Sequence, residues 1–145
     1  PALSPAELRL RREQYGAVKW TERALEAVVA ESPLVEVGAG RGQWQKALAA
    51  RGADVVAYDN MSSPNTRSAP LGQVLHGSED IVGKYSNRAL LLVYPNPGPM
   101  ASNCLRHFGG KTLVYVGEGR GGVNCDDDFF DALSNGWRLV REEPV

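Results

Sequence analysis

An acidic residue stands inside an apolar run that leads into alternating glycines. Glu36 lies within LVEV (34–37), and Gly38, Gly40 and Gly42 follow in the stretch GAGRG. A carboxylate at a strand end suits a cationic ligand group and would repel a pyrophosphate, while free N–H groups at a helix start suit a ligand carboxylate. These residue types favour a ligand that carries an ammonium, a sulfonium and a carboxylate, as S-adenosylmethionine does.

A second acidic residue, Asp59, ends the run DVVAYD (54–59), where it could accept the hydroxyl groups of a ribose. Asp59 does not separate S-adenosylmethionine from NAD, because NAD-binding proteins also place an acidic residue there. The glycine spacing is more discriminating. The dinucleotide fingerprint G-x-G-x-x-G needs a glycine where this chain has Gln43. NAD binding and a glycine turn without a cofactor stay open as alternatives.

Alternating apolar runs and helical patterns must position these residues. Strands are predicted at 34–38, 54–59, 73–77, 88–94, 111–117 and 137–141, the last of them after an Asn135-Gly136 turn. Helices are predicted from Pro5, behind a capping box at Ser4, and at 22–31, 43–51, 100–108 and 129–134, with a short one at 79–85 and a polar loop at 61–72. This order predicts an α/β fold with a mostly parallel sheet of five or six strands and helices on both faces. We expect an N-terminal helical extension (1–32) that packs on a sheet domain (33–145).

Two stretches resemble a known family. VEVGAGRG (35–42) and VVAYD (55–59) are similar to motif I and the following acidic strand end of class I S-adenosylmethionine-dependent methyltransferases, which have a Rossmann-like fold. As a pattern of elements, the resemblance spans roughly residues 33 to 140. It implies that Glu36 holds the amino group of the cofactor and that Asp59 binds its ribose. The cofactor-binding residues that it implies are Glu36, Gly38, Ala39, Gly40, Gly42, Tyr58, Asp59, Asn60, Gly77, Ser78 and Glu79.

The fourth strand ends in a proline-rich loop, Tyr94 to Pro99. Many members of the family have an Asp or Asn followed by Pro-Pro and an aromatic residue here, and these groups hold an amine that is methylated. The order differs in this chain, which argues against an amine as the acceptor. Tyr94, Asn96 and Glu118, the last in a glycine-rich loop after strand five, are the candidate catalytic residues. Two alternatives stay open, a rigid loop that only ends the strand and a mobile loop around Glu118.

The family's sheet usually gains a seventh, antiparallel strand beside strand five. Only EEPV (142–145) follows WRLVR (137–141) in this chain, so we expect that strand to be absent. Strand five would then be an open edge, which proteins normally protect. The resemblance therefore implies a reduced fold, a C-terminally truncated chain, or an edge covered by a homo-oligomer or another partner.

Composition narrows the classes of function. The formal net charge of −1 gives no sign of a nucleic-acid partner, and no apolar run approaches the ~18 residues of a membrane span. Cys104 and Cys125 lack metal-ligand spacing, and the absence of a secretory signal predicts reduced thiols in the cytoplasm, with a disulfide as the open alternative. The first hypothesis is an S-adenosylmethionine-dependent methyltransferase with a small-molecule acceptor and no metal. A non-catalytic binding module and, less favoured, an NAD-binding oxidoreductase are the alternatives.

Overall fold

The computed structural model describes residues 4–62 and 69–144. Its helices are α1 (Pro5–Tyr15), α2 (Glu22–Val29), α3 (Gln43–Ala50), the 3₁₀ helix η2 (Glu79–Lys84), α4 (Met100–His107) and α5 (Asp127–Gly136). Its strands are β1 (Leu34–Val37), β2 (Val55–Asp59), β3 (Leu75–His76), β4 (Ala89–Val93) and β5 (Leu113–Val116). Helices and strands mostly alternate from β1 onward, as the apolar runs predict.

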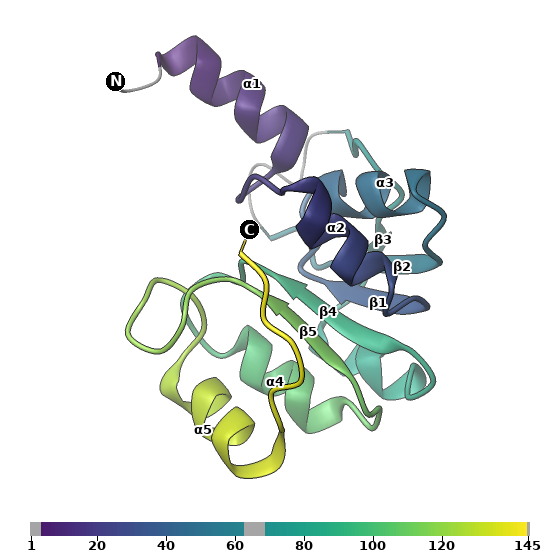
Figure 1. Ribbon diagram of the computed structural model, residues 1–145, viewed down its shortest axis with the longest axis vertical. Coiled ribbons are helices and arrows are strands. Elements are labelled where there is room, and N and C mark those ends of the chain that lie inside the picture. The colour runs from purple at the N-terminus through teal and green to yellow at the C-terminus, as the bar shows by residue number, and fades with distance from the viewer. Residues whose placement is uncertain (1–3, 63–68, 145) are drawn as a thin grey trace.

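The five strands form one parallel sheet in the order β3-β2-β1-β4-β5 (Figure 1). The predicted α/β fold is confirmed, and the architecture is Rossmann-like. The chain builds outward from β1 through β2 to β3, then returns to the other side of β1 for β4 and β5. The reversal of strand order therefore lies between β1 and β4, and sheets of this kind bind ligands beyond the carboxyl ends of the strands at that point.

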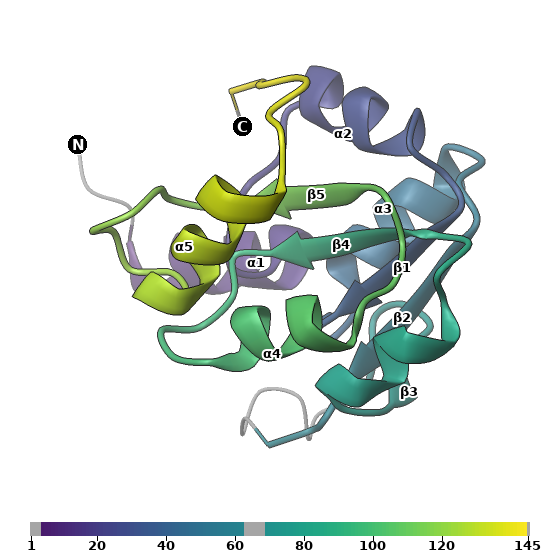
Figure 2. The same ribbon diagram turned by 90° about the horizontal axis from the view of Figure 1, so that it is seen from below.

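Helices cover both faces of the sheet (Figure 2). α2 and α3 pack on one face around a buried cluster that includes Leu34 and Leu91. η2, α4 and α5 pack on the other face around a cluster that includes Val35 and Leu92. Because side chains alternate along a strand, Glu36 must share the face of Leu34, under α2 and α3.

Residues 4–32 contain two helices that differ in burial. Ser4 caps α1 by accepting a hydrogen bond from the backbone N–H of Glu7, as the capping box predicts, and α1 has no buried residue. α2 presents an apolar stripe to the sheet, in which Leu25 and Val28 are buried. α2 is therefore part of the core, whereas α1 extends away from the body of the molecule (Figure 1).

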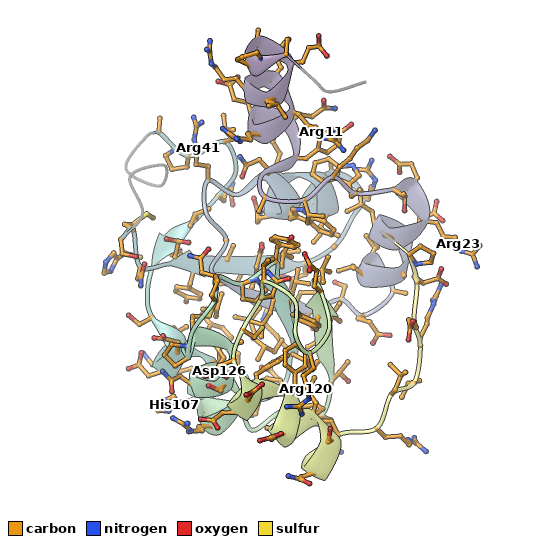
Figure 3. The ribbon with its side chains drawn as sticks, turned by 90° about the vertical axis from the view of Figure 1, so that its left-hand side faces the viewer. Arg11, Arg23, Arg41, His107, Arg120 and Asp126 are labelled. Atoms are coloured by element: carbon orange, nitrogen blue, oxygen red, sulfur yellow. The ribbon has the colours of Figure 1, made fainter. Side chains whose placement is uncertain are left out.

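The predicted strand at 137–141 is wrong. Trp137 stacks on Phe108, but the side chains of Leu139 and Val140 after it are 75% and 82% exposed, and the segment has no strand pairing. The chain instead runs from α5 back to α2, where Glu143 forms an ion pair of 2.9 Å with Arg23 (Figure 3). Within the described residues β5 is thus paired on one side only, with β4.

Most element boundaries also differ from the prediction by one or two residues. α5 begins at Asp127, earlier than expected, because the Asp126 side chain accepts the N–H of Phe129 and caps the helix. The predicted Asn135-Gly136 turn forms the end of that same helix. β3 is reduced to two residues, Leu75 and His76, and part of the predicted loop 61–72 lies outside the described residues.

Two further properties concern the whole described chain. Its helices are too short or too polar for any of them to traverse a lipid bilayer. Cys104 and Cys125 are free thiols and both are buried.

Candidate functional site

The carboxyl ends of the parallel strands bring most of the predicted site residues to one edge of the sheet. The glycine loop (38–42) follows β1, Asn60 follows β2, and Gly77 follows β3. Tyr94 follows β4, and Glu118 lies two residues after β5. Residues that are distant in sequence therefore line one edge, as a parallel sheet requires.

The glycine loop depends on its glycines. Gly38, Gly40 and Gly42 have φ angles of +79°, +60° and +86°, a region that other residues rarely adopt. Gly42 immediately precedes α3, and no side chain caps that helix. The first N–H groups of α3 are thus not used by a capping side chain, and such groups can receive a ligand carboxylate.

Glu36 is the more deeply buried of the two acidic residues at this edge. Its residue is only 2% exposed, beneath α2 and α3, and its Oε1 atom has no hydrogen-bond partner among the described residues. Burial, and then the negative charge of nearby Asp59, raise the pKa of Glu36 to about 8. Without a ligand the carboxyl group is therefore mainly neutral at pH 7. A buried polar atom without a partner is costly, so the unpaired oxygen of Glu36 is the unusual feature of this edge.

Asp59 is also buried, but both of its oxygens already have partners. Oδ2 accepts the N–H of Gly40 at 2.8 Å, and Oδ1 accepts the N–H of Met61 at 2.8 Å. Asp59 thus fixes the shape of the glycine loop from the neighbouring strand. An ionised carboxylate can accept about four hydrogen bonds, so ribose hydroxyls would have to share these oxygens with the loop.

Leu71 and Gly72, which precede β3, pack on the glycine loop, a contact that sequence reasoning missed. The N–H groups of Leu71 and Gly72 both donate to the carbonyl oxygen of Arg41, at 2.7 and 2.9 Å. Gly72 packs so closely that a Cβ atom there would overlap the carbonyl oxygen of Gly42 and lie 2.6 Å from Gln45 Oε1. The one trace of this contact in the sequence is that both positions, Gly42 and Gly72, are glycines, which allow their backbones to approach closely.

The remaining predicted cofactor residues lie around β2 and β3. Ala39 is buried in the glycine loop, and the side chain of Asn60 accepts the N–H of Ser62. Ser78 is exposed and Glu79 is half-buried at the start of η2. Tyr58 points away from Glu36, into the cluster under η2 and α4, where its hydroxyl is hydrogen-bonded to that of Tyr85.

Of the three candidate catalytic residues, the structure brings two together. The hydroxyl of Tyr94 donates to Glu118 Oε2 at 2.8 Å, and this bond raises the pKa of Tyr94. Asn96 is exposed, and its side chain is bonded to no described residue, although its carbonyl accepts the N–H of Cys125. Sequence reasoning missed Asn124, a buried amide that donates to Pro95 O and accepts Glu118 N.

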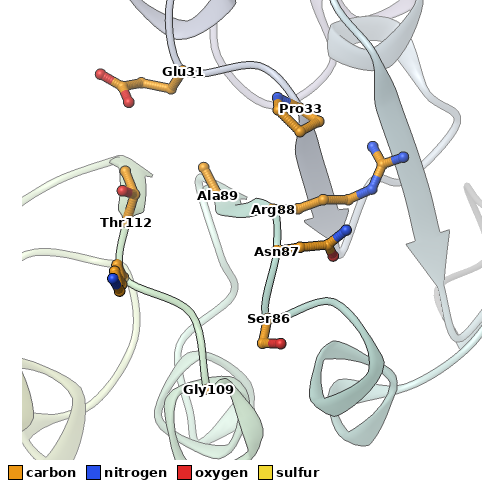
Figure 4. Close-up of a pocket in the computed structure, with 9 residues that line it drawn as sticks. Glu31, Pro33, Ser86, Asn87, Arg88, Ala89, Gly109 and Thr112 are labelled. Atoms are coloured by element: carbon orange, nitrogen blue, oxygen red, sulfur yellow. The ribbon is translucent and has the colours of Figure 1, made fainter.

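Two surface hollows of the described residues lie elsewhere. One, of about 370 Å³, lies between α2 and α3 beside Glu22 and Arg51. The other, of about 450 Å³, lies at the amino ends of the strands, among residues such as Pro33, Arg88 and Thr112 (Figure 4). Neither touches the glycine loop. Within residues 4–62 and 69–144, no three metal-ligating side chains gather into a metal site.

Comparison of the chain with models of protein families, with curated proteins and with solved structures gave no match.

Proposed function

We propose that the chain is an S-adenosylmethionine-dependent methyltransferase that acts on a small molecule. The observation that carries the proposal is Glu36, a buried carboxyl with an unpartnered oxygen at the reversal of strand order, next to a glycine loop. A ligand ammonium would supply the missing partner and restore the negative charge of Glu36. The sequence resemblance of residues 35–42 and 55–59 supports the same assignment.

Each part of the cofactor has a suitable partner in this assignment. The glycine loop and the start of α3 offer N–H groups to the methionyl carboxylate. Asp59 would accept the ribose hydroxyls while it keeps its bonds to the loop. The adenine would lie between Asn60 and the segment 77–79, which follow the neighbouring strands.

Methyl transfer requires few catalytic groups from the protein. The sulfonium of the cofactor is an activated donor, so placing an acceptor in line with the S–CH₃ bond lowers much of the barrier. The loops after β4 and β5 adjoin the reversal of strand order, on the side away from β2. They are the segments that would hold the acceptor.

Ligand-dependent stabilisation tests the binding part of the proposal. At one hundred times its dissociation constant, S-adenosylhomocysteine should stabilise the protein by about 2.7 kcal/mol, or roughly 5–10 °C in Tm, whereas NAD should not. At pH 7, binding should also release up to one proton from Glu36, measurable by calorimetry in buffers of different ionisation enthalpy. Glu36→Gln should abolish the proton release and weaken binding about 10- to 100-fold.

The controls separate this proposal from NAD binding and from no binding. Glu13→Gln removes a carboxyl group from the exposed surface of α1 and should bind S-adenosylhomocysteine like the wild type. Equal stabilisation by NAD, or full affinity and full proton release in Glu36→Gln, would contradict the assignment.

A non-catalytic binding module is the second candidate. It is favoured by the loop after β4, in which the Asn96 amide is exposed and bonded to no described residue, so no preformed amine site is evident in the described residues. Incubation with methyl-labelled S-adenosylmethionine and a panel of acceptors separates the two candidates. Binding without any transfer of label would favour the module.

A further inference from the structure

The loops that follow β4 and β5 are fastened to each other at the carboxyl edge of the sheet. The side chain of Asn124 bridges them, because its Nδ2 donates to Pro95 O at 2.8 Å and its Oδ1 accepts Glu118 N at 2.7 Å. Backbone bonds add a second link, from Cys125 N to Asn96 O and from Gly98 N to Cys125 O. Asn124 is 4% exposed, so water competes little for these bonds. The two loops therefore form one firm unit.

Within this unit, the hydroxyl of Tyr94 and the carboxylate of Glu118 form a hydrogen-bonded pair. Tyr94 has a φ of +45°, which is uncommon for a residue other than glycine and which signals a constrained conformation. Its ring packs against the buried cluster under α2 and α3, and its hydroxyl donates to Glu118 Oε2 at 2.8 Å. Tyr115 holds the backbone of Glu118 from the other side, because its hydroxyl donates to the Glu118 carbonyl at 2.5 Å. Glu118 itself is exposed, and its second oxygen, Oε1, has no hydrogen bond to a described residue.

The pair stands near the proposed cofactor site. β1 and β4 are neighbours, and Glu36 is paired in register with Leu91. The glycine loop follows β1 and Tyr94 follows β4 directly, so both lie at the carboxyl ends of these neighbouring strands. The ring of Tyr94 also packs on the same face of the sheet as Glu36. A molecule seated beyond β4 and β5 would thus lie between the glycine loop and the carboxylate of Glu118.

We propose that Glu118 is the general base for methyl transfer to a phenolic hydroxyl group, and that Tyr94 is the positioning residue that orients its carboxylate. This inference rests on the proposed methyltransferase function and names its acceptor class. In the step, the acceptor oxygen bonds to the methyl carbon while the S–CH₃ bond breaks and its electrons pass to sulfur. The acceptor proton passes to Glu118 Oε1. The products are the methyl ether, S-adenosylhomocysteine and a protonated Glu118, which then loses its proton to water.

The chemistry of the pair favours a phenol over an amine or an aliphatic alcohol. A neutral amine attacks through its free lone pair and needs no base before the transfer. An aliphatic alcohol is too weak an acid for a carboxylate to assist strongly, whereas a phenol is closer to a match. The Tyr94 hydroxyl occupies Oε2 and keeps its own proton, since its bond to Glu118 raises the pKa of Tyr94. Oε1 is therefore the oxygen left to accept a proton.

Two acceptors of different acidity test the role of Glu118. At pH 8, 4-methylphenol is almost wholly protonated, whereas 4-nitrophenol is largely ionised and needs no base. Glu118→Gln should lower kcat/KM for 4-methylphenol by about 10²–10⁴-fold and lower that for 4-nitrophenol by less than about threefold. Affinity for S-adenosylhomocysteine, measured on the same variant, should be unchanged and shows that it is folded.

A second variant tests the positioning role. Tyr94→Phe should lower kcat for 4-methylphenol about tenfold with KM unchanged, and it should add no further loss in the Glu118→Gln background. Equal losses on both phenols, or no loss on either, would overturn the assignment of a base. Wild-type protein that binds S-adenosylhomocysteine but methylates neither phenol would overturn the acceptor class and leave the proposed cofactor intact. Failure to bind S-adenosylhomocysteine would overturn both proposals together.

Discussion

Replacement of Glu36 by glutamine should make the stability of the protein much less dependent on pH. Glu36 has a pKa of about 8 in the folded chain and about 4.5 as an unperturbed group. Between these values the folded chain binds one more proton than the unfolded chain, so the free energy of unfolding falls as pH rises. The slope is about 1.4 kcal/mol per pH unit, and the total loss by pH 8 is roughly 3 to 5 kcal/mol. The stabilising effect of protonated Glu36 is thus fully present below pH 4.5 and is lost as pH rises through about 8.

Glu36→Gln has no such titration, so it should become progressively more stable than the wild type from pH 5 to 8. Urea unfolding at half-unit pH steps measures the difference, in which the titration of all other groups largely cancels. Glu13→Gln, on the exposed surface of α1, is the control for loss of a surface carboxyl group and should follow the wild-type curve. A constant difference between wild type and Glu36→Gln across this range would mean that Glu36 is ionised in the folded protein.

Gly72→Ala should destabilise the protein by about 3 kcal/mol and lower Tm by roughly 6–12 °C. The added methyl group would overlap the carbonyl oxygen of Gly42, and a backbone atom cannot move aside as a flexible side chain can. Leu71 and Gly72 would have to lift, which breaks their bonds to Arg41. Because Gly42 leads into α3, affinity for S-adenosylhomocysteine should fall as well.

Gly119→Ala is the matched control, since a methyl group there meets open space and the residue does not need a positive φ. Its Tm should lie within about 2 °C of the wild-type value, as for an ordinary surface change. Calorimetry on both variants gives the comparison. A Gly72→Ala protein as stable as Gly119→Ala would show that residues 71–72 do not pack on the glycine loop in solution.

The sequence predicted the parts of the fold that depend on burial alone. β4 and β1 are buried along their whole length; the run of β4 is entirely apolar, and that of β1 is apolar except for Glu36. The segment 137–141 (WRLVR) has three apolar residues and was also predicted as a strand, but it forms none. An apolar pattern indicates that a segment could be buried in a sheet. It does not show whether a neighbouring strand is available to pair with that segment. The ring of Trp137 stacks on that of Phe108, whereas the side chains of Leu139 and Val140 remain exposed.

The candidate site was predicted in part for a related reason. Glu36 and the glycine loop are adjacent in sequence, so their shared position followed from a single strand end. The pairing of Tyr94 with Glu118 depends on two loops that meet only when β4 and β5 lie side by side. Asn124 had no signal at all, because an asparagine in a polar loop is ordinary until its burial is known.

Trp20 and Trp44 lie at α3, the helix that follows the glycine loop, so their fluorescence is sensitive to changes at that loop. Trp44, in the first turn of α3, is 3% exposed, and Trp20 meets it edge to face at 5.7 Å. The indole N–H of Trp44 donates to Val18 O, so any shift of α3 alters both its hydrogen bond and its neighbour. Trp137, the third indole, lies on the opposite face of the sheet against Phe108. Intrinsic fluorescence should therefore report any shift of α3 that the proposed cofactor causes when it binds, without a label.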